Sequence, residues 1–280
     1  MISGEQFQKL SQISLYTETN DIIENQNNCL EQNLVKISDL DVNEIKKYNI
    51  IFVYTHFLEN FFDKFYNHLK NDTVIISHNS DARVDEKFFK YLEGNKIKKW
   101  YCQNRFIIHD KLVSLPIGLA NSQWPHGNQE LITKVKDLNL EKEILVYKNF
   151  DKSTNRDARF HCDTVTSING IPMGSQTSNE EYWMNIAKSA FVISPPGNGI
   201  DCHRIWECLY LKAMPVVLKH EALSQFDDLP ILFVDSWDDV TVDFLKYKLP
   251  ESRLLLEKYH DKKFSNLKVT DIDFWKKIIV

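Results

Sequence analysis

Short runs of apolar and β-branched residues alternate along this chain with longer stretches in which apolar residues recur every three or four positions. The short runs predict strands, and the longer amphipathic stretches predict helices. The expected strands cover 49–54, 73–77, 97–101, 111–115, 144–147, 190–194, 215–218 and 231–234. The expected helices cover 56–70, 84–93, 128–138, 154–168, 179–188, 201–212, 221–227, 238–248 and 250–260. Alternation of this kind predicts an α/β protein with parallel sheets and helices on both faces.

Two prolines and two glycines interrupt this alternation between residues 114 and 127. Such a segment is typical of a domain boundary, and a second series of strands and helices follows it. We therefore expect two similar α/β domains, 1–140 and 141–280. Residues 270–280 have the pattern of an amphipathic helix, which must bury its apolar side on one of the domains, the first being a candidate. Residues 1–33 are rich in amides and weakly patterned, so we expect them to be partly irregular.

The composition fits a globular protein and argues against several classes of function. The chain has 280 residues, of which 43% are hydrophobic, and a formal net charge of −5. It can fill a sizeable core, and without a Lys/Arg block it is not expected to bind nucleic acid. No segment approaches the roughly 20 apolar residues that span a bilayer, and the start of the chain lacks a signal-peptide pattern. Five scattered cysteines without a CxxC pair suit a reducing compartment, so we expect a cytoplasmic protein.

The segment from Phe191 to Glu207 is the most informative for function. It predicts a buried strand, a loop with the sequence SPPGNG, and a helix whose first turns carry His203, Arg204 and Glu207. A loop that leads into a helix N-terminus presents backbone N–H groups without helical partners and a partial positive charge. The segment therefore predicts an anion site, for which a phosphate group is the natural ligand.

The predicted helix separates an apolar side from a polar side. At about 100° per residue, one stripe faces the sheet; it consists of Cys202, Ile205, Trp206, Leu209 and Ala213. His203, Arg204 and Glu207 fall together on the other side, where Arg204 can clamp phosphate oxygens and Glu207 can bind a ribose diol. Asp201 is expected to cap the helix. An ordinary capped helix with an internal Arg–Glu pair is the alternative.

The same residues carry a resemblance to a known family. The segment from Ser194 to Glu207, continued by AMPVV at 213–217, resembles the C-terminal donor-binding motif of exostosin-like glycosyltransferases. It is similar in particular to the glycosyltransferases with which chloroviruses build capsid glycans. The resemblance implies a GT-B architecture: two Rossmann-like domains with a cleft between them, a nucleotide sugar held by the second domain and an acceptor by the first. It also implies inverting transfer of a sugar, with xylose as one candidate, from a UDP-sugar to a glycan hydroxyl.

Carried over to this chain, the family motif assigns a set of donor-binding residues. They are Ser194, Pro196, Gly197, Asn198, Gly199, Asp201, His203, Arg204 and Glu207. The segment from Gly197 to Asp201 would meet the diphosphate, where the two glycines let the backbone approach closely. Arg204 would neutralise phosphate charge as the nucleotide leaves, and a GT-B site can supply such charge without a metal or another cofactor.

A second loop of the second domain, residues 149–159, follows the strand at 144–147. Arg156 and Arg159 are further candidates for phosphate contacts, with Lys148 and Lys152 nearby. A solvated helix start, capped by Thr154 or Asn155, is the alternative.

In the first domain, Ser77-His78-Asn79-Ser80-Asp81 follows a predicted strand. Ligand groups gather at the carboxyl ends of parallel strands, so this segment is expected on the acceptor side. An inverting transfer needs a general base, for which Asp81 and then His78 are the candidates. A turn with a helix cap is the alternative. His56, after the preceding strand, is a weaker candidate. Trp124 and His126 of the boundary segment are expected to line the cleft, with packing between the domains as the alternative for Trp124.

Three other features limit the interpretation. Two DxD triplets, 39–41 and 271–273, are not expected to bind a metal, because the second has the position of a helix cap and the first lies outside any expected strand-end loop. A dehydrogenase is disfavoured by the lack of a GxGxxG after an early strand. A non-catalytic protein that binds a nucleotide sugar or a glycan stays open; it would lack the general base.

Overall fold

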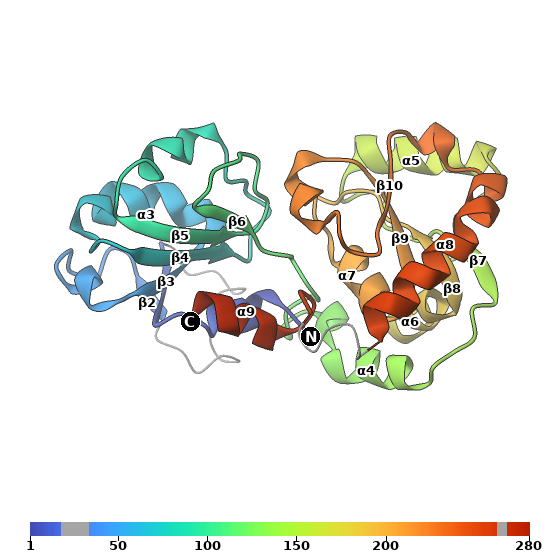
Figure 1. The fold of residues 1–280 in the computed structure, drawn as a ribbon, viewed down its shortest axis with the longest axis horizontal. Helices are drawn as coiled ribbons and strands as arrows, with labels where there is room; N and C mark the ends of the chain where they lie inside the picture. Colours follow the sequence, from blue (N-terminus) through green and yellow to red (C-terminus); the bar gives the residue numbers. More distant parts are fainter. Residues whose placement is uncertain (18–33, 262–267) are drawn as a thin grey trace. The chain divides into compact units, whose positions relative to one another are not determined.

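A computed structural model describes residues 1–17, 34–261 and 268–280, and these residues form two compact units that each contain one parallel sheet (Figure 1). Unit 1 comprises Met1–Gly127 and Asp271–Val280, and unit 2 comprises Asn128–Thr270. Every pairing between the described strands is parallel. The predicted α/β class is confirmed, and all eight expected strands are present.

The sheet of unit 1 has the strand order β2-β1-β3-β4-β5-β6. The strands are β1 (Ile13–Tyr16), β2 (Leu34–Lys36), β3 (Ile50–Tyr54), β4 (Thr73–His78), β5 (Ile97–Cys102) and β6 (Leu112–Ser114). The sequence did not predict β1 and β2. Each is only three or four residues long, so an alternating pattern has little length in which to show itself. Of the amide-rich start of the chain, residues 18–33 lie outside the described part.

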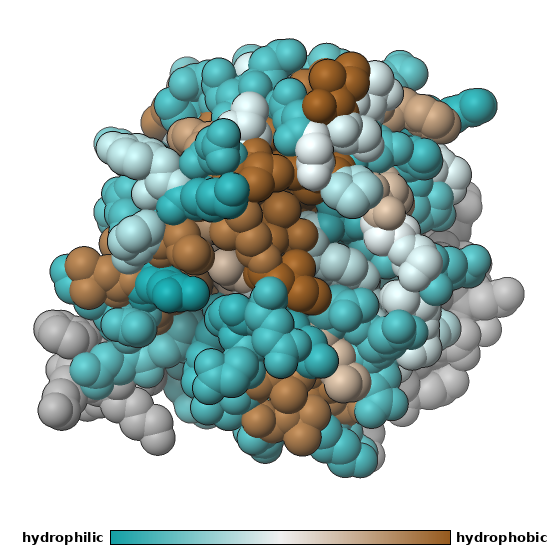
Figure 2. Space-filling view, turned by 90° about the vertical axis from the view of Figure 1, so that its right-hand side faces the viewer, coloured by the Kyte–Doolittle hydropathy of each residue, from teal (hydrophilic) through white to brown (hydrophobic). Residues whose placement is uncertain are grey.

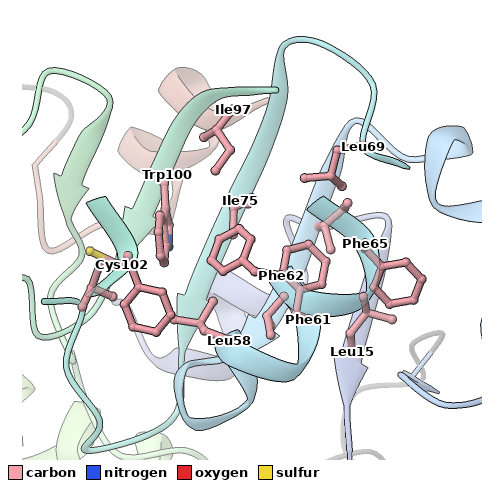
Figure 3. Packing of buried hydrophobic residues seen from close by; sticks show 14 of the residues in the cluster. Leu15, Leu58, Phe61, Phe62, Phe65, Leu69, Ile75, Ile97, Trp100 and Cys102 are labelled. Carbon is pink, nitrogen blue, oxygen red and sulfur yellow. The ribbon is translucent and has the colours of Figure 1, made fainter. Parts of the chain in front are cut away.

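The core of unit 1 forms where α3 packs on this sheet. Phe61, Phe62 and Phe65 of α3 (Leu58–Phe65) are buried among residues of the strands (Figure 3). The ring of Phe62 lies 5.2 Å from that of Trp100 in β5. The other described helices of unit 1 are α1 (Gly4–Gln8), α9 (Ile272–Ile279) and the 3-10 helices η1 (Glu44–Lys47), η2 (Thr55–Phe57), η3 (Tyr66–His68), η4 (Glu86–Tyr91) and η5 (Pro125–Gly127).

The C-terminal helix α9 packs within unit 1. The ring of Trp275 lies 5.7 Å from that of Phe7 in α1, and the Tyr101 hydroxyl donates a hydrogen bond to the Ile278 carbonyl at 3.0 Å. The units divide after Gly127, at the end of the Pro/Gly-rich segment. Residues 128–140, which we expected in the first domain, belong to unit 2 because their helix α4 (Gln129–Asp137) packs on α6 (Asn179–Lys188).

The sheet of unit 2 has the order β10-β9-β8-β7, and its inner strand β8 is buried over its whole length. The strands are β7 (Ile144–Tyr147), β8 (Ser189–Ile193), β9 (Met214–Leu218) and β10 (Leu232–Val234). The helices besides α4 and α6 are α5 (Arg156–Ile168), α7 (His203–Tyr210), α8 (Val242–His260), η6 (Glu221–Phe226) and η7 (Trp237–Asp239). The two helices expected around Pro250 are one helix, α8. Leu245 and Leu256, on either side of the proline, are buried in the same core and hold both halves in line.

Strand β7 is an edge of this sheet, and three of its four residues are only half-buried: Ile144, Leu145 and Val146. Unit 2 also exposes the large apolar side chains Phe160, Ile168, Tyr247, Leu254 and Leu255. Figure 2 shows apolar side chains gathered in the middle of one face of the molecule, with hydrophilic residues around them. Across the ranges that the structure describes, no helix has the length and apolar character needed to cross a membrane.

Candidate functional site

The SPPGNG loop extends from the carboxyl end of β8. Ser194 still belongs to the sheet ladder, since its N–H donates to the Val216 carbonyl at 2.9 Å, and its hydroxyl turns back to the Val192 carbonyl at 3.1 Å. Ser194 is therefore buried as an anchor of the loop. Beyond it the chain rises to the surface: Gly197 is buried, Pro196, Gly199 and His203 are half-buried, and Asn198 is exposed.

The start of α5 holds the loop in place. Asn155 caps this helix, as one of the two caps expected, and its side-chain amide donates to the Gly197 carbonyl at 2.7 Å. Arg159 is buried, and its Nε donates to the Pro196 carbonyl at 2.9 Å. A Cβ atom on Gly197 would lie 3.2 Å from Nη2 of Arg159, so glycine keeps the space beside the guanidinium open. Arg156, by contrast, is exposed and lies over the ring of Phe160.

Helix α7 begins two residues later than expected, and Asp201 does not cap it. The N-cap residue is Cys202, which makes no side-chain capping bond. The Asp201 carboxylate instead accepts a hydrogen bond from the indole N–H of Trp206 at 2.8 Å. Trp206 is buried, as the apolar stripe predicted, and a buried indole N–H needs an acceptor. The Trp206 hydrogen bond therefore accounts for the burial of Asp201.

Glu207 and Arg204 share one side of α7, since the Tyr182 hydroxyl bonds both, but this side is covered at Glu207 and not open to solvent. Only 5% of Glu207 is exposed, and its Oε1 accepts a hydrogen bond from the indole N–H of Trp183 at 3.1 Å. Trp183 lies on α6, which covers this side of α7, and a wheel drawn for one helix does not include such a neighbour. Burial raises the pKa of Glu207, against the opposing effects of the Trp183 hydrogen bond and the Arg204 charge. A ribose contact by Glu207 stays a prediction.

The guanidinium group of Arg204 is hydrogen-bonded at Nε, whereas its Nη1 lacks an acceptor among the described residues. Its Nε donates to the Tyr182 hydroxyl at 2.9 Å, and Tyr182 in turn hydrogen-bonds the Glu207 carboxylate. Its Nη1 is buried and has no hydrogen-bond partner in the described part of the chain. No ion pair of Arg204 occurs within the described ranges. A buried guanidinium nitrogen without an acceptor is costly, so this atom marks a place for an oxygen atom from outside the chain.

Arg159 and Arg204, here called the arginine pair, share one neighbourhood. Their guanidinium carbons lie 5.8 and 5.6 Å from the centre of the Phe150 ring. Burial lowers the pKa of Arg159, and the charge of Arg204 lowers it further. Two cations that repel one another in a partly desolvated place create a positive potential that an anion would relieve. The arginine pair and the SPPGNG loop together form a candidate anion site.

Lys148 and Lys152, the other cations expected near the phosphate, have a different partner. The Nζ atoms of Lys148 and Lys152 lie 3.0 and 2.9 Å from the carboxylate oxygens of Asp163 in α5. The Lys148 side chain is fully buried and also donates to the hydroxyls of Thr166 and Ser167. Lys148 therefore fastens α5 to the end of β7, and its charge is neutralised within the protein.

The two candidate bases of unit 1 occupy different environments. His78 is 1% exposed, and its Nδ1 accepts the backbone N–H of Asn79 at 2.8 Å while its Nε2 lies 3.0 Å from the Pro116 carbonyl. Burial lowers its pKa to about 4, against the hydrogen bonds to Pro116 and Asn79. Both nitrogens are thus used within the protein, so His78 has no free lone pair with which to take a proton. Asp81 is exposed. Trp124 is partly exposed and stacks on His126.

Within the described residues, no three His, Cys, Asp or Glu side chains lie close enough together to hold a metal ion. Of the two DxD triplets, the first forms local hydrogen bonds to Ser38 and Asn43. In the second, Asp271 has the N-cap position of α9, without a side-chain capping bond. The described cysteines 102, 162, 202 and 208 are free and buried, and Cys29 lies outside the described residues.

Three residues that shape the site are not predicted by the sequence: Phe150, Tyr182 and Trp183. Phe150 follows β7, and the other two lie on α6, more than twenty positions before their partners in α7. An apolar or aromatic side chain beside a predicted strand or helix is read as core. Only the packing of α6 on α7 shows that Tyr182 and Trp183 orient charged groups.

Comparison with known proteins identifies no family for this chain. No family model matches it, and no curated protein does. Among solved structures it is similar to a glycosyltransferase from Rickettsia africae ESF-5, with a TM-score of 0.48 and 11% sequence identity. The alignment covers 98% of this chain and 92% of that chain. At this distance the likeness carries no argument about function, so the candidate site rests on its own residues.

Proposed function

We propose that this chain is a glycosyltransferase that holds the diphosphate of a nucleotide sugar between the SPPGNG loop and the arginine pair of unit 2. The observation that carries the proposal is the buried Nη1 of Arg204, which has no hydrogen-bond partner among the residues that the structure describes. A phosphate oxygen supplies the acceptor and the negative charge that this position lacks. Because the cations come from the chain itself, the departing diphosphate is stabilised without a metal or another cofactor.

The nature of the donor follows from the resemblance of this segment to the donor motif of exostosin-like glycosyltransferases. It supports a UDP-sugar, inversion at the anomeric carbon and a GT-B arrangement in which unit 1 receives a glycan acceptor. Glu207 would accept hydrogen bonds from the ribose with the capacity that Trp183 and Tyr182 leave unused. A xylosyl donor, a role in capsid glycans and a cytoplasmic location rest on the resemblance alone.

The test is a thermal-shift and hydrolysis screen with UDP, GDP, UDP-xylose, UDP-glucose and UDP-N-acetylglucosamine, with and without Mg²⁺. We expect UDP and at least one UDP-sugar to raise the melting temperature without Mg²⁺, and that UDP-sugar to be hydrolysed slowly. Absence of any response to UDP compounds would refute the donor site. A response that needs Mg²⁺ would refute metal-independent binding.

A binding protein without catalysis is the second candidate function, and the burial of His78 favours it, since this removes one of the two expected bases. The two functions differ in whether Asp81 takes the proton of an acceptor hydroxyl.

We expect Asp81→Asn to lower transfer about a hundredfold or more, because a positioned general base contributes that much. UDP affinity should stay unchanged, since Asp81 belongs to unit 1. The measurement is product formation from the UDP-sugar found in the screen, with isothermal titration of UDP as the control. Asp85→Asn, a change a few residues along the same segment, is the matched variant. Equal turnover in wild type and Asp81→Asn would show that another group is the base.

A further inference from the structure

Unit 2 contains a cavity of about 580 Å³ at the amino edge of its sheet. Its lining includes residues 139–142, which precede β7, and Lys212, which precedes β9. The rest comes from Ala190 at the start of β8, from the second half of α8, which packs on β7 and β8, and from Asp261. The volume is typical of ligand sites. Because the SPPGNG loop leaves the carboxyl end of β8, this cavity is separate from the candidate anion site.

Lys142 brings a partly buried amine without a counter-ion to this cavity. Its Nζ donates to the carbonyls of Ala187 and Leu211, at 2.7 and 3.3 Å, at the C-terminal ends of α6 and α7. These carbonyls occupy two of its three N–H groups and carry only partial negative charges. Within the described ranges Lys142 makes no ion pair. Burial, and after it the charge of Lys212, lowers the pKa of Lys142 to about 8, so the ammonium lacks stabilisation where it lies.

Lys212 lines the same cavity in a strained backbone conformation. Its φ is 59°, and it follows Leu211, the C-cap residue of α7, at a position where glycine is usual. Its Nζ donates to Oδ1 of Asn139 at 2.9 Å, and Asn139 lines the cavity with a φ of 46°. Lys212 also has no ion pair in the described part of the chain. Strain of this kind gathers at ligand sites, so a lysine at a glycine position indicates a use for its side chain.

The remaining lining selects among anions. Leu140, Leu249 and Leu256 give the cavity an apolar surface. The exposed carboxylates of Glu141 and Glu257 also line it, and they would repel a multiply charged anion such as phosphate. The ligand that suits this combination carries one negative charge on an apolar body.

We propose that this cavity binds a small carboxylic acid with an apolar body, whose carboxylate pairs with Lys142 and Lys212. The carboxylate accepts the remaining N–H of Lys142 and supplies the counter-ion that both lysines lack. The apolar body packs on Leu249 and Leu256 and removes their surface from water. This second site does not depend on the proposed function.

The experiment uses the full chain, with isothermal titration for binding and calorimetry for the melting temperature. The ligands are octanoate, its neutral counterpart octanol, and inorganic phosphate. We expect octanoate to bind and to raise the melting temperature, and octanol to bind about tenfold more weakly or less, because it lacks the charge-assisted hydrogen bond. Neither phosphate nor UDP should displace octanoate. Equal binding of octanol, displacement by phosphate or UDP, or no binding of octanoate would overturn the proposal.

Two variants place octanoate in this cavity. Lys142→Met should weaken its binding about tenfold or more. Lys212→Gly should weaken it at least about threefold and leave the melting temperature unchanged or higher, because glycine relieves the left-handed backbone. Asp72→Gly, which changes an exposed residue of unit 1 with a φ of 64°, is the matched control and should keep octanoate affinity. Lys142→Met also takes the donor from two carbonyls, so Lys212→Gly decides if that variant does not fold. Wild-type octanoate affinity in the folded lysine variants would overturn the proposal.

The pH dependence of octanoate affinity identifies the amine that binds. Affinity should fall as pH rises through about 8, because Lys142 then loses its proton. Burial and the charges of Lys268, Lys212 and Lys136 lower the pKa of His260 to about 4, so it is already neutral there, and burial raises the pKa of Cys208 in α7. The other charged groups at the cavity are Lys212, Arg253, Glu141, Glu257 and Asp261. Lys142→Met should remove the fall near pH 8, and an equally steep fall in this variant would overturn the role of Lys142.

Discussion

Replacing Arg204 by methionine is expected to reduce affinity for UDP about a hundredfold or more. The guanidinium would make two charge-assisted hydrogen bonds to phosphate, and each contributes about 1.5–3 kcal/mol, while a tenfold change in affinity corresponds to about 1.4 kcal/mol. The rate of sugar transfer should fall by a larger factor than the affinity, because Arg204 would stabilise the charge that develops on the leaving diphosphate in the transition state. Isothermal titration with UDP and steady-state kinetics measure the two effects.

The stability of the Arg204→Met variant separates a binding role from a structural one. Removal of Arg204 eliminates an unsatisfied Nη1 but also takes a cation from beside the buried Glu207, so we expect some loss of unfolding free energy without ligand; a loss of UDP affinity in protein that is still folded is the sign of a binding role. Arg156→Met is the matched control: this arginine is exposed on the first turn of α5 and should keep both UDP affinity and stability. Unchanged UDP affinity in Arg204→Met would remove this residue from the donor site.

Two further variants test how Arg204 is oriented. Arg204→Lys keeps the charge but loses the planar fork, so it should retain only part of the affinity. Tyr182→Phe removes the hydroxyl that accepts from Arg204 Nε at 2.9 Å. The guanidinium then loses its fixed end, and UDP affinity should fall by less than in Arg204→Met. The UDP affinities of the three Arg204 and Tyr182 variants would rank the contributions of charge, of the planar guanidinium and of its orientation to anion binding.

The sequence predicted the parts of this fold that depend on long local patterns. Strand β8 and the helix after it were expected because a continuous apolar run and a 3.6-residue period extend over many positions. Strand β1 has four residues, too few for such a pattern, and its pairing with β3 is set by residues more than thirty positions away. Pro250 was read as a break, yet packing on both sides of it keeps α8 continuous.

Within the candidate site, the sequence placed the loop and Arg204 but not their surroundings. The residue types and their spacing indicated an anion-binding site, because glycines, a helix start and an arginine can all be recognised in the sequence without knowledge of the fold. The environment of Glu207 depends on Trp183, and that of Lys148 depends on Asp163, each from a different element. Whether a charged side chain faces solvent or a partner is a tertiary property, so local periodicity grouped Glu207 with Arg204 but did not show that α6 covers it.

Asp163→Asn is expected to destabilise unit 2 by about 3–5 kcal/mol, the typical cost of leaving a buried charge without its partner. The Lys148 ammonium is fully buried, and Asp163 is its carboxylate at 3.0 Å. The hydroxyls of Thr166 and Ser167 would still accept hydrogen bonds from Lys148 but would not neutralise it. Denaturant unfolding of wild type and variant measures the loss. Asp157→Asn, an exposed change on the same helix, is the control and should stay within about 0.5 kcal/mol of wild type.

The pH dependence of stability gives the same interaction a second signature. Burial acts to raise the pKa of Asp163, but its hydrogen bonds with Lys152 and Lys148 outweigh this effect, so the pKa is lowered. The stabilisation is then complete above the unfolded-state pKa of about 3.9 and is lost as pH falls through the lower folded-state value. Asp163→Asn should therefore flatten the acid limb of the stability curve. An unchanged acid limb would mean that the pair contributes nothing to acid unfolding.

This interior ion pair also bears on the donor site, because α5 carries both Asn155, its cap, and Arg159, which hold the SPPGNG loop. If Lys148 and Asp163 fasten α5 to β7, then Asp163→Asn should weaken UDP binding even under conditions in which unit 2 stays folded. Replacing both partners, Lys148→Met with Asp163→Asn, removes the unpaired charge and should recover part of the lost stability. Recovery of UDP affinity together with stability would show that the pair acts on the site by positioning α5. Recovery of stability alone would show that the charge of Lys148 itself contributes to the potential felt by the diphosphate.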